Sequence, residues 1–323
     1  MSFESYPPPF RQQSHVVHSD DSSKTLQDFD LIPTIDLQCL DLDNLHGACK
    51  NWGLFRLVNH GIPPTLLNQL QDHAKKLFSI PFETKQTLFT SPFSYFWGTP
   101  ALSPSGTSLL NSSGNINWVE GLNIPLPHLS QIQSQTLSSF RVLLEEYGNH
   151  LARLSRALYE AMAKKLNLDT LESKSNLSES NGSLRVYRYP YYSDEADEAA
   201  WGLDVHTDSS VFSILSQDQV GGLEVLNHDQ WFNVKPIPNT LIVNIGDMMQ
   251  AISDDEYKSV KHRVKVNRSR ERVSICYFVF PEEGRVIRSS KYKPFTYSDF
   301  QAQVQKDIKT LGYKVGLERF RAY

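Results

Sequence analysis

Two residue pairs at i, i+2 spacing carry chemistry that this sequence could perform. His206 and Asp208 flank Thr207 in a run that alternates like a β-strand, so both side chains can lie on one face of the strand. Imidazole nitrogens and carboxylate oxygens are common ligands of transition metals. The spacing alone proves little, because His18 and Asp20 near the N-terminus share it. A metal site needs a third ligand.

The remaining histidines of the β-rich region are His228 and His262. His228 lies between Asn227 and Asp229 and is more simply an exposed turn residue. His262 begins the β-like run HRVKV, which can place it beside His206 and Asp208. Two histidines and one carboxylate form the facial triad of non-haem Fe(II) oxygenases, with positions left open for O2 and a cosubstrate. The sequence therefore predicts an iron site.

The second pair is Arg272 and Ser274, which begins ten residues after His262. The i, i+2 spacing again places both side chains on one strand face, where the guanidinium can bind a carboxylate through two hydrogen bonds and the hydroxyl can add a third. A surface salt bridge for Arg272 and a sheet-filling role for Ser274 are the structural alternatives. Beside an iron site, the pair favours a dicarboxylate cosubstrate.

The surrounding chain is divided by composition and periodicity into four parts. Residues 1–28 contain few aliphatic side chains and are expected to form a disordered tail. Residues 29–168 are expected to be a mixed, largely helical region, and residues 180–290 a jelly-roll core of about seven short strands. Residues 291–323 are expected to supply a C-terminal helix that packs on this core.

Three helices and one long loop are predicted in these parts. Apolar residues recur at helical spacing over 64–78 and 131–168. A last helix is predicted over 297–311, with Ser298 as its N-cap. Residues 91–130, rich in Ser, Asn, Gly and aromatic residues, are expected to form a long functional loop.

Composition excludes several classes of protein. The 323 residues include 32 Lys plus Arg and 36 Asp plus Glu, a net charge of −4, which disfavours nucleic acid as a partner. No apolar run is long enough to span a membrane, and the N-terminal residues lack the pattern of a signal peptide. Cys39, Cys49 and Cys276 are widely spaced and are expected to stay reduced, in the cytoplasm or nucleus. A monomer is expected, because the triad needs no residue from a neighbour.

The ordered set of HTD, His262 and Arg-x-Ser resembles the plant soluble Fe(II)- and 2-oxoglutarate-dependent dioxygenases. NWGLFRLVNHGIP, at residues 51–63, resembles the N-terminal half of that family, and WFNVKPIPNTLIVNIGD, at residues 231–247, resembles its core strands. The likeness covers nearly the whole chain after the tail. It implies an α+β fold in which a double-stranded β-helix, or jelly roll, is flanked by α-helices.

The resemblance also implies roles for individual residues. His206, Asp208 and His262 would be the iron ligands, and Arg272 with Ser274 would bind the distal carboxylate of 2-oxoglutarate. Tyr189 would hydrogen-bond the same carboxylate, unless it is only a core tyrosine. Tyr187 is a departure from the family, which commonly has Asn at this position, so the resemblance does not extend to a polar contact from Tyr187 to the cosubstrate. O2 would be the second cosubstrate and ascorbate a reductant. The retained carboxylate indicates hydroxylation or another oxidation rather than halogenation.

Within this family the chain resembles gibberellin oxidases, especially gibberellin 2-oxidase-like sequences. WVEGL at residues 118–122 and YKPFTYSDF at residues 292–300 carry that likeness, although enzymes acting on flavonoids, alkaloids and auxin share both segments. The substrate would be a carboxylated plant metabolite. Arg188 is one possible cation for the carboxylate of such a substrate. In a regular strand, however, its side chain points to the face opposite Tyr189. The candidate pocket residues, each of which could instead be an ordinary core aromatic, are Phe96, Trp97, Trp118 and Phe278.

Two other classes of function remain open on the residues alone. A zinc hydrolase could use two histidines and one carboxylate, but it would have no use for Arg272 beside the metal. A non-catalytic jelly-roll ligand sensor could retain the same residues without turnover.

Overall fold

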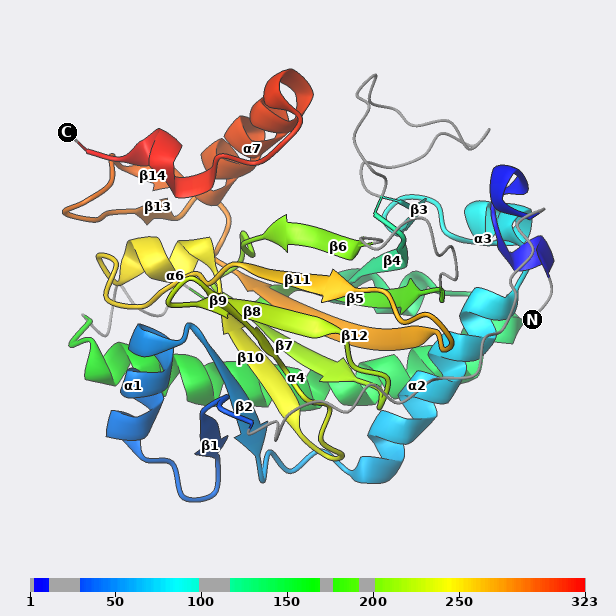
Figure 1. Cartoon of the computed structure of the whole chain (residues 1–323), viewed down its shortest axis with the longest axis horizontal. Helices are drawn as coiled ribbons and strands as arrows, with labels where there is room; N and C mark the ends of the chain where they lie inside the picture. The colour runs from blue at the N-terminus through cyan, green and yellow to red at the C-terminus, as the bar shows by residue number, and fades with distance from the viewer. Residues whose placement is uncertain (1–2, 12–29, 99–116, 169–176, 192–200, 323) are drawn as a thin grey trace.

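The computed structural model describes residues 3–11, 30–98, 117–168, 177–191 and 201–322. Two β-sheets face each other at its centre, the smaller one in front of the larger in Figure 1. In sheet order, the larger sheet comprises β1 (Thr34–Asp36), β2 (Leu54–Val58), β10 (Leu241–Ile245), β7 (Phe212–Gln217), β12 (Arg272–Phe280), β5 (Ser178–Tyr189), β4 (Glu120–Pro125) and β3 (Ser94–Trp97). The smaller sheet comprises β6 (Trp201–His206), β11 (His262–Lys265), β8 (Leu223–Asn227) and β9 (Gln230–Asn233). The arrangement is the predicted jelly roll.

Helices cover the outer face of the larger sheet. The buried residues of α1 (Leu42–Asn51), α2 (Pro64–Ser79) and α4 (Ser138–Lys165) join those of the sheet in one hydrophobic core. The long α4 runs behind the strands in Figure 1. Because these helices bury one side of the larger sheet, its other side faces the smaller sheet and lines the barrel interior.

β12 shows how the sequence separates these two faces. Its residues Arg272–Val279 are all buried, yet successive side chains point in opposite directions. Val273, Ile275 and Tyr277 belong to the core under the helices, whereas Cys276 and Phe278 belong to a second cluster between the sheets. The residues on the side of Cys276 are therefore those available to a site inside the barrel.

The remaining elements complete the two ends of the barrel. They are α3 (Phe82–Leu88), α6 (Asp247–Ile252), the short pair β13 (Val286–Ile287) and β14 (Phe295–Thr296), and α7 (Tyr297–Leu311). The helices predicted over 64–78 and 297–311 are confirmed within one residue at each end. The N-cap of α7 is Thr296 rather than Ser298, because Thr296 and Asp299 form a reciprocal capping box.

Two segments differ from the sequence-based expectation. The predicted loop over 91–130 contains β3 and β4, which extend the larger sheet beside β5, and its residues 99–116 lie outside the described part of the chain. Residues 3–11 are not a free tail, since they form two short 3-10 turns and bury Tyr6. This segment has few aliphatic side chains and is held instead by its aromatic residues, with Phe10 stacked on Trp97 and Tyr6 beside Arg188. The rest of the predicted tail, residues 1–2 and 12–28, lies outside the described residues.

None of the helices in the described part of the chain is long and apolar enough to cross a membrane.

Candidate metal centre and carboxylate site

Strand pairing brings His206 and His262 together from distant parts of the sequence. His206 ends β6 and His262 begins β11, and the two are direct partners in the antiparallel register of these strands. Their ring centroids are 4.3 Å apart. The smaller sheet therefore presents both imidazoles at one end of the barrel interior.

Asp208 lies two residues beyond β6 and faces the same two imidazoles. Its Oδ1 atom is 3.9 Å from Nε2 of His206 and 3.7 Å from Nε2 of His262. Its Oδ2 atom accepts hydrogen bonds from Ser213 Oγ and Asn244 Nδ2, both at 2.8 Å. One carboxylate oxygen is thus held by the larger sheet while the other is directed at the histidines.

Backbone carbonyls orient the two imidazoles. Nδ1 of His206 lies 2.7 Å from the carbonyl oxygen of Asp204, and Nδ1 of His262 lies 3.2 Å from that of Val260. When each Nδ1 carries the proton and donates it to the carbonyl, each Nε2 keeps its lone pair for a metal. The ligand atoms of the three residues lie within 4.8 Å of one another.

The charge states suit a divalent cation. Burial and the neighbouring His262 imidazole lower the pKa of His206 to about 3, so this ring is neutral at physiological pH. Burial alone would raise the pKa of Asp208, but the two histidines and the hydrogen bonds from Asn244 and Ser213 outweigh it and lower that pKa. Two imidazole nitrogens and one carboxylate are the donor set that Fe(II) takes in the facial triad. The residues fit the implied metal.

Arg272 forms a second site deeper in the barrel. Its side chain is 1% exposed, with Nη1 donating to Ser274 Oγ at 3.1 Å and Nη2 to Gln217 Oε1 at 2.8 Å. Nε has no hydrogen-bond partner, and no described carboxylate pairs with the guanidinium. A buried charge without a counter-ion is costly, so this environment fits an anionic ligand. A carboxylate group of 2-oxoglutarate meets that need.

Tyr189 lies beside this guanidinium, as its place in the register requires. It is the β5 partner of Arg272, and the Arg272 guanidinium carbon lies 5.0 Å from the centre of its ring. The ring rests on β6 at Gly202, where an added Cβ would meet a ring carbon at 2.5 Å. Glycine at this position therefore lets the smaller sheet approach Tyr189 and close the barrel over the carboxylate site.

The four predicted pocket aromatics fall into two groups. Phe96 and Phe278 belong to the cluster between the sheets, together with Tyr187 and Cys276. Trp97 and Trp118 belong instead to a separate cluster in which both contact Phe10. Trp97 points to the face of β3 opposite Phe96, and Trp118 precedes β4, so the contacts of these two tryptophans lie outside the cluster between the sheets. Their place in the substrate pocket stays a prediction.

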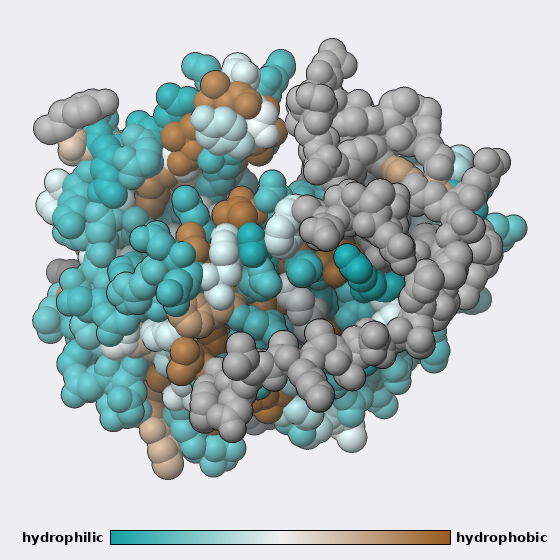
Figure 2. Space-filling model, viewed as in Figure 1, coloured by the Kyte–Doolittle hydropathy of each residue, from teal (hydrophilic) through white to brown (hydrophobic). Residues whose placement is uncertain are grey.

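An apolar rim lies at the metal end of the barrel. Figure 2 shows hydrophobic side chains on α7 and again on the strands below it, within a mostly hydrophilic face. Val205 of β6 and Ile308 and Leu311 of α7 are exposed. The His206 side chain is itself 28% exposed, so this candidate ligand is partly open to solvent.

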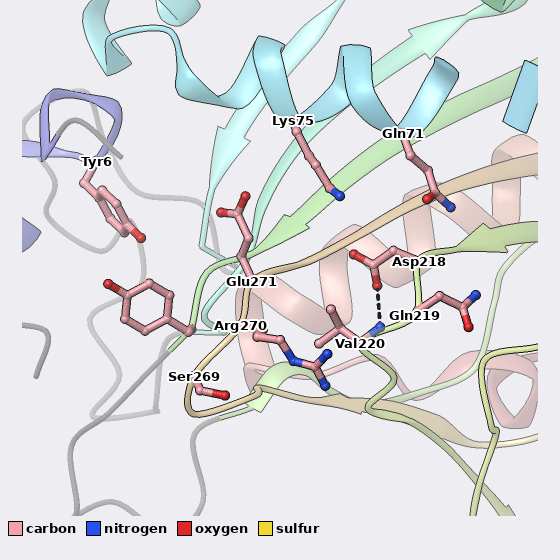
Figure 3. Close-up of a pocket in the computed structure, with 10 residues that line it drawn as sticks. Tyr6, Gln71, Lys75, Asp218, Gln219, Val220, Ser269, Arg270 and Glu271 are labelled. Atoms are coloured by element: carbon pink, nitrogen blue, oxygen red, sulfur yellow. Dashed lines mark hydrogen bonds between the residues drawn. The ribbon is translucent and has the colours of Figure 1, made fainter. Parts of the chain in front are cut away.

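A separate pocket of about 570 Å³ lies where β7 ends and β12 begins (Figure 3). Lys75 of α2 points into this pocket. The two acidic residues that line the pocket, Asp218 and Glu271, already have partners. Asp218 accepts hydrogen bonds from the backbone of Val220, as drawn in Figure 3, and of Val273, and Glu271 is paired with Arg188. It contains none of the predicted metal ligands.

Arg185 was not among the predicted site residues, although a signal for it exists. In LRVYRYP, residues 185, 187 and 189 alternate, so the rule that places Tyr189 inside the barrel also places Arg185 there. Arg188 points the other way and forms ion pairs with Glu120 and Glu271. It is not available to a substrate inside the barrel.

Comparisons with known proteins agree with this geometry. Residues 181–281 match the family model described as 2OG-Fe(II) oxygenase superfamily, and residues 32–139 match non-haem dioxygenase in morphine synthesis N-terminal. The chain is 38% identical over 279 residues to gibberellin 2-beta-dioxygenase 8 of Arabidopsis thaliana, an alignment that covers 84% of this chain and 79% of the relative. The chain belongs to the 2OG-Fe(II) oxygenase superfamily.

Other superfamily members align over most of their length. Gibberellin 2-beta-dioxygenase 7 of Arabidopsis thaliana is 36% identical over 321 residues, covering 94% of this chain and 92% of that protein. A solved structure of JOX2 in complex with 2OG, Fe and JA has a TM-score of 0.75 and 31% identity, covering 90% of this chain and 89% of that one. As a superfamily member this protein is a 2-oxoglutarate-dependent dioxygenase, an oxidoreductase whose cofactors are Fe(II) and 2-oxoglutarate. The zinc-hydrolase and sensor interpretations are not favoured.

Proposed function

We propose that this dioxygenase hydroxylates a gibberellin or a gibberellin precursor, with iron held by His206, Asp208 and His262. The likeness to two gibberellin 2-beta-dioxygenases supports the substrate class. The convergence of the three ligand atoms within 4.8 Å, beside a buried guanidinium that pairs with no carboxylate of the described residues, is the observation that carries the chemistry. Fe(II) with 2-oxoglutarate supplies the oxidising chemistry when bound, as O2 is reduced and 2-oxoglutarate is decarboxylated to succinate and CO2.

We assign the rest of the site to binding and orientation. Arg272 binds the distal carboxylate of 2-oxoglutarate, with Ser274 and Tyr189 adding hydrogen bonds to the same group. Ser213 and Asn244 hold one oxygen of Asp208, which leaves the other for the metal. Phe96 and Phe278 supply apolar walls that exclude water from the substrate side of the site.

The test begins with an anaerobic titration of the metal-free protein with Fe(II) and 2-oxoglutarate. The weak visible absorption band of the chelated cosubstrate monitors binding. O2 and a panel of gibberellins, auxins and flavonoids are then supplied, and mass spectrometry detects any product that has gained oxygen. A band together with an oxidised gibberellin is the expected result. Oxidation of another panel member alone would refute gibberellin as the substrate.

Variants test the ligand assignment in the same assay. His206→Ala and His262→Ala are expected to abolish both the band and turnover. His228→Ala is the matched control, because His228 is exposed in the turn between β8 and β9. Turnover at the wild-type rate in either ligand variant would overturn the assignment.

We further propose a monomer that acts in the cytoplasm or nucleus on a carboxylated substrate. Three free cysteines support a reducing compartment. Light scattering of the purified protein and fluorescence microscopy of a tagged full-length chain test the first two points. Comparing free acids with their methyl esters tests the third.

A further inference from the structure

Arg185 is a positively charged side chain on the inner face of β5. It is the register partner of Cys276 on β12. Along the same face of the sheet, the next pair is Tyr187 with Ser274, and the pair after that is Tyr189 with Arg272. Its guanidinium carbon lies 4.7 Å from the centre of the Phe278 ring, which belongs to the cluster between the sheets. Arg185 therefore faces the barrel interior beyond the 2-oxoglutarate end.

The described residues leave this guanidinium poorly satisfied. Its two hydrogen bonds, from Nε to Asn123 Oδ1 and from Nη1 to the Tyr187 hydroxyl, are both long at 3.4 Å. Asn123 Oδ1 already accepts a 2.7 Å bond from Ser183 Oγ. No carboxylate in the described part of the chain forms an ion pair with Arg185, whereas Arg188 on the opposite face has two.

Tyr187 places a second polar group beside the guanidinium. Its side chain is buried, and its ring contacts Phe96 at 6.2 Å and Tyr189 at 6.0 Å between centroids. The hydroxyl is the group that meets Arg185. The Arg185 guanidinium and the Tyr187 hydroxyl thus lie together among aromatic rings. The low dielectric constant of such surroundings strengthens a charge-assisted hydrogen bond to a ligand.

Charge balance indicates the sign of that ligand. Asp208 and the two carboxylates of 2-oxoglutarate would match the charges of the iron and of Arg272. Among the described residues of the barrel interior, Arg185 is then a cation that no carboxylate balances, and a guanidinium stays charged at every physiological pH. An anionic ligand beside Arg185 would balance this charge.

We propose that Arg185 and the Tyr187 hydroxyl bind the carboxylate of the substrate and so select carboxylated over neutral metabolites. This inference rests on the proposed oxygenase function and specifies its substrate subsite. It assigns a role to Tyr187, which stands where related sequences commonly have Asn.

The experiment compares wild type, Arg185→Gln, Arg185→Lys and Tyr187→Phe on free acids and on their methyl esters. The probes are a gibberellin, indole-3-acetic acid and jasmonic acid, each paired with its methyl ester. Loss of one charge-assisted contact is expected to raise the KM of Arg185→Gln for the preferred acid by about 10- to 100-fold. Arg185→Lys should recover part of this loss, Tyr187→Phe should show a smaller one, and no variant should change the KM for the ester.

Anaerobic binding separates this proposal from its alternatives. Each variant should form the Fe(II)·2-oxoglutarate band at the wild-type midpoint, which also shows that it is folded. Arg288→Gln, a change at an exposed arginine, is the matched control. A shifted midpoint for 2-oxoglutarate in Arg185→Gln would mean that Arg185 binds the cosubstrate and would overturn the proposal.

Substrate binding is read from the change that each acid causes in the same band, so it does not depend on turnover. If the gibberellin is inert but another acid binds and loses affinity in Arg185→Gln, gibberellin fails as substrate and the subsite stands. Equal binding of acids and esters to wild type, or no binding by any acid, would overturn the subsite.

Discussion

The two carboxylate oxygens of Asp208 have different partners. Ser213 and Asn244 donate to Oδ2, and Oδ1 faces the two histidines. Hydrogen bonds of this kind fix a ligand's orientation before the metal arrives, so less ordering is required on binding.

Removing one of these donors should weaken the metal site without removing a ligand. Asn244→Leu is expected to lower Fe(II) affinity by about 10- to 100-fold, because Oδ2 loses a donor and the carboxylate can rotate. Anaerobic Fe(II) titration in the presence of 2-oxoglutarate measures the change. Asn239→Leu, at an exposed turn, is the control. An unchanged midpoint for Asn244→Leu would show that Asp208 is oriented by other contacts.

Arg272 is a buried cation whose counter-ion would be the cosubstrate. For wild type, 2-oxoglutarate at about 100 times its Kd should stabilise the protein against unfolding by about 2.7 kcal/mol. Arg272→Met should lose most of this stabilisation while still binding Fe(II). Thermal unfolding with and without 2-oxoglutarate measures it, and Arg288→Met is the control. Equal ligand-induced shifts in Tm for Arg272→Met and wild type would remove Arg272 from the site.

At the scale of elements, the segment after α7 ties down the loop that carries Asp208. Lys314 donates to the carbonyl of Thr207 at 2.8 Å and to Ser209 Oγ at 3.0 Å, and it forms an ion pair with Asp247 of α6 at 2.5 Å. The C-terminal region therefore braces the metal loop from outside the barrel.

Lys314→Met is expected to lower Fe(II) affinity by about 10-fold, because the loop around Asp208 loses two hydrogen bonds. Asp247 would be left buried without its cation, so the double variant Lys314→Met with Asp247→Asn separates that electrostatic cost from the loss of bracing. The Fe(II) titration is carried out at a temperature at which circular dichroism shows that both variants are fully folded. Wild-type affinity in both would show that the loop is rigid without Lys314.

A second connection, at Asp255, should make stability depend on pH. Asp255 accepts hydrogen bonds from Arg321, Tyr292 and Gln250, joining the turn after α6 to the C-terminus. Burial would raise its pKa, but these bonds outweigh burial and lower the pKa below the usual 3.8. The carboxylate therefore stabilises the folded state at neutral pH, and this contribution is lost as the pH falls through the folded-state pKa.

Asp255→Asn is expected to reduce the free energy of unfolding by roughly 1–3 kcal/mol at pH 7, and by less at pH 3.5, where wild type has itself lost part of the contribution. Urea unfolding at both pH values measures the difference. A difference that is the same at pH 7 and pH 3.5 would contradict the role of the ionised carboxylate.

At the scale of the whole molecule, the N-terminal segment 3–11 packs against elements that lie far from it in the sequence. Phe10 stacks on Trp97 at 4.9 Å, and the Tyr6 ring lies 4.9 Å from the guanidinium carbon of Arg188. Lys85 donates to the carbonyl of Ser5 and forms an ion pair with Glu120. The segment thereby covers a buried group of charges between α3, β4 and β5.

Phe10→Ala should lower the free energy of unfolding by roughly 1–3 kcal/mol, because Trp97 and Trp118 lose a shared aromatic contact. Affinity for 2-oxoglutarate should not change, since Arg272 lies in the barrel interior. Tyr313→Ala, at a residue that is 63% exposed, is the control and should cost under about 0.5 kcal/mol. Equal unfolding midpoints for the two variants would mean that the N-terminal segment contributes nothing to stability.

Local spacing was sufficient to predict two of the helices and to select candidate metal ligands. The helical period set the bounds of α2 and α7 within one residue, and the i, i+2 rule placed Arg272 and Ser274 on one face of β12. These predictions succeed because backbone geometry fixes which near neighbours share a face, whatever the rest of the chain does.

The tertiary structure decided what depends on contacts between distant segments. The sequence favoured His262 over His228 as the third ligand, but only the register of β6 with β11 places His262 directly opposite His206, since strand pairing is not encoded in either strand alone. Strand alternation places Arg188 and Arg185 on opposite faces of β5, but only packing shows that Arg188 is paired with two glutamates and that no described carboxylate forms an ion pair with Arg185. The sequence by itself determined which residues could do chemistry, and the folded chain decided which of them are charged, buried and unpartnered at the same place.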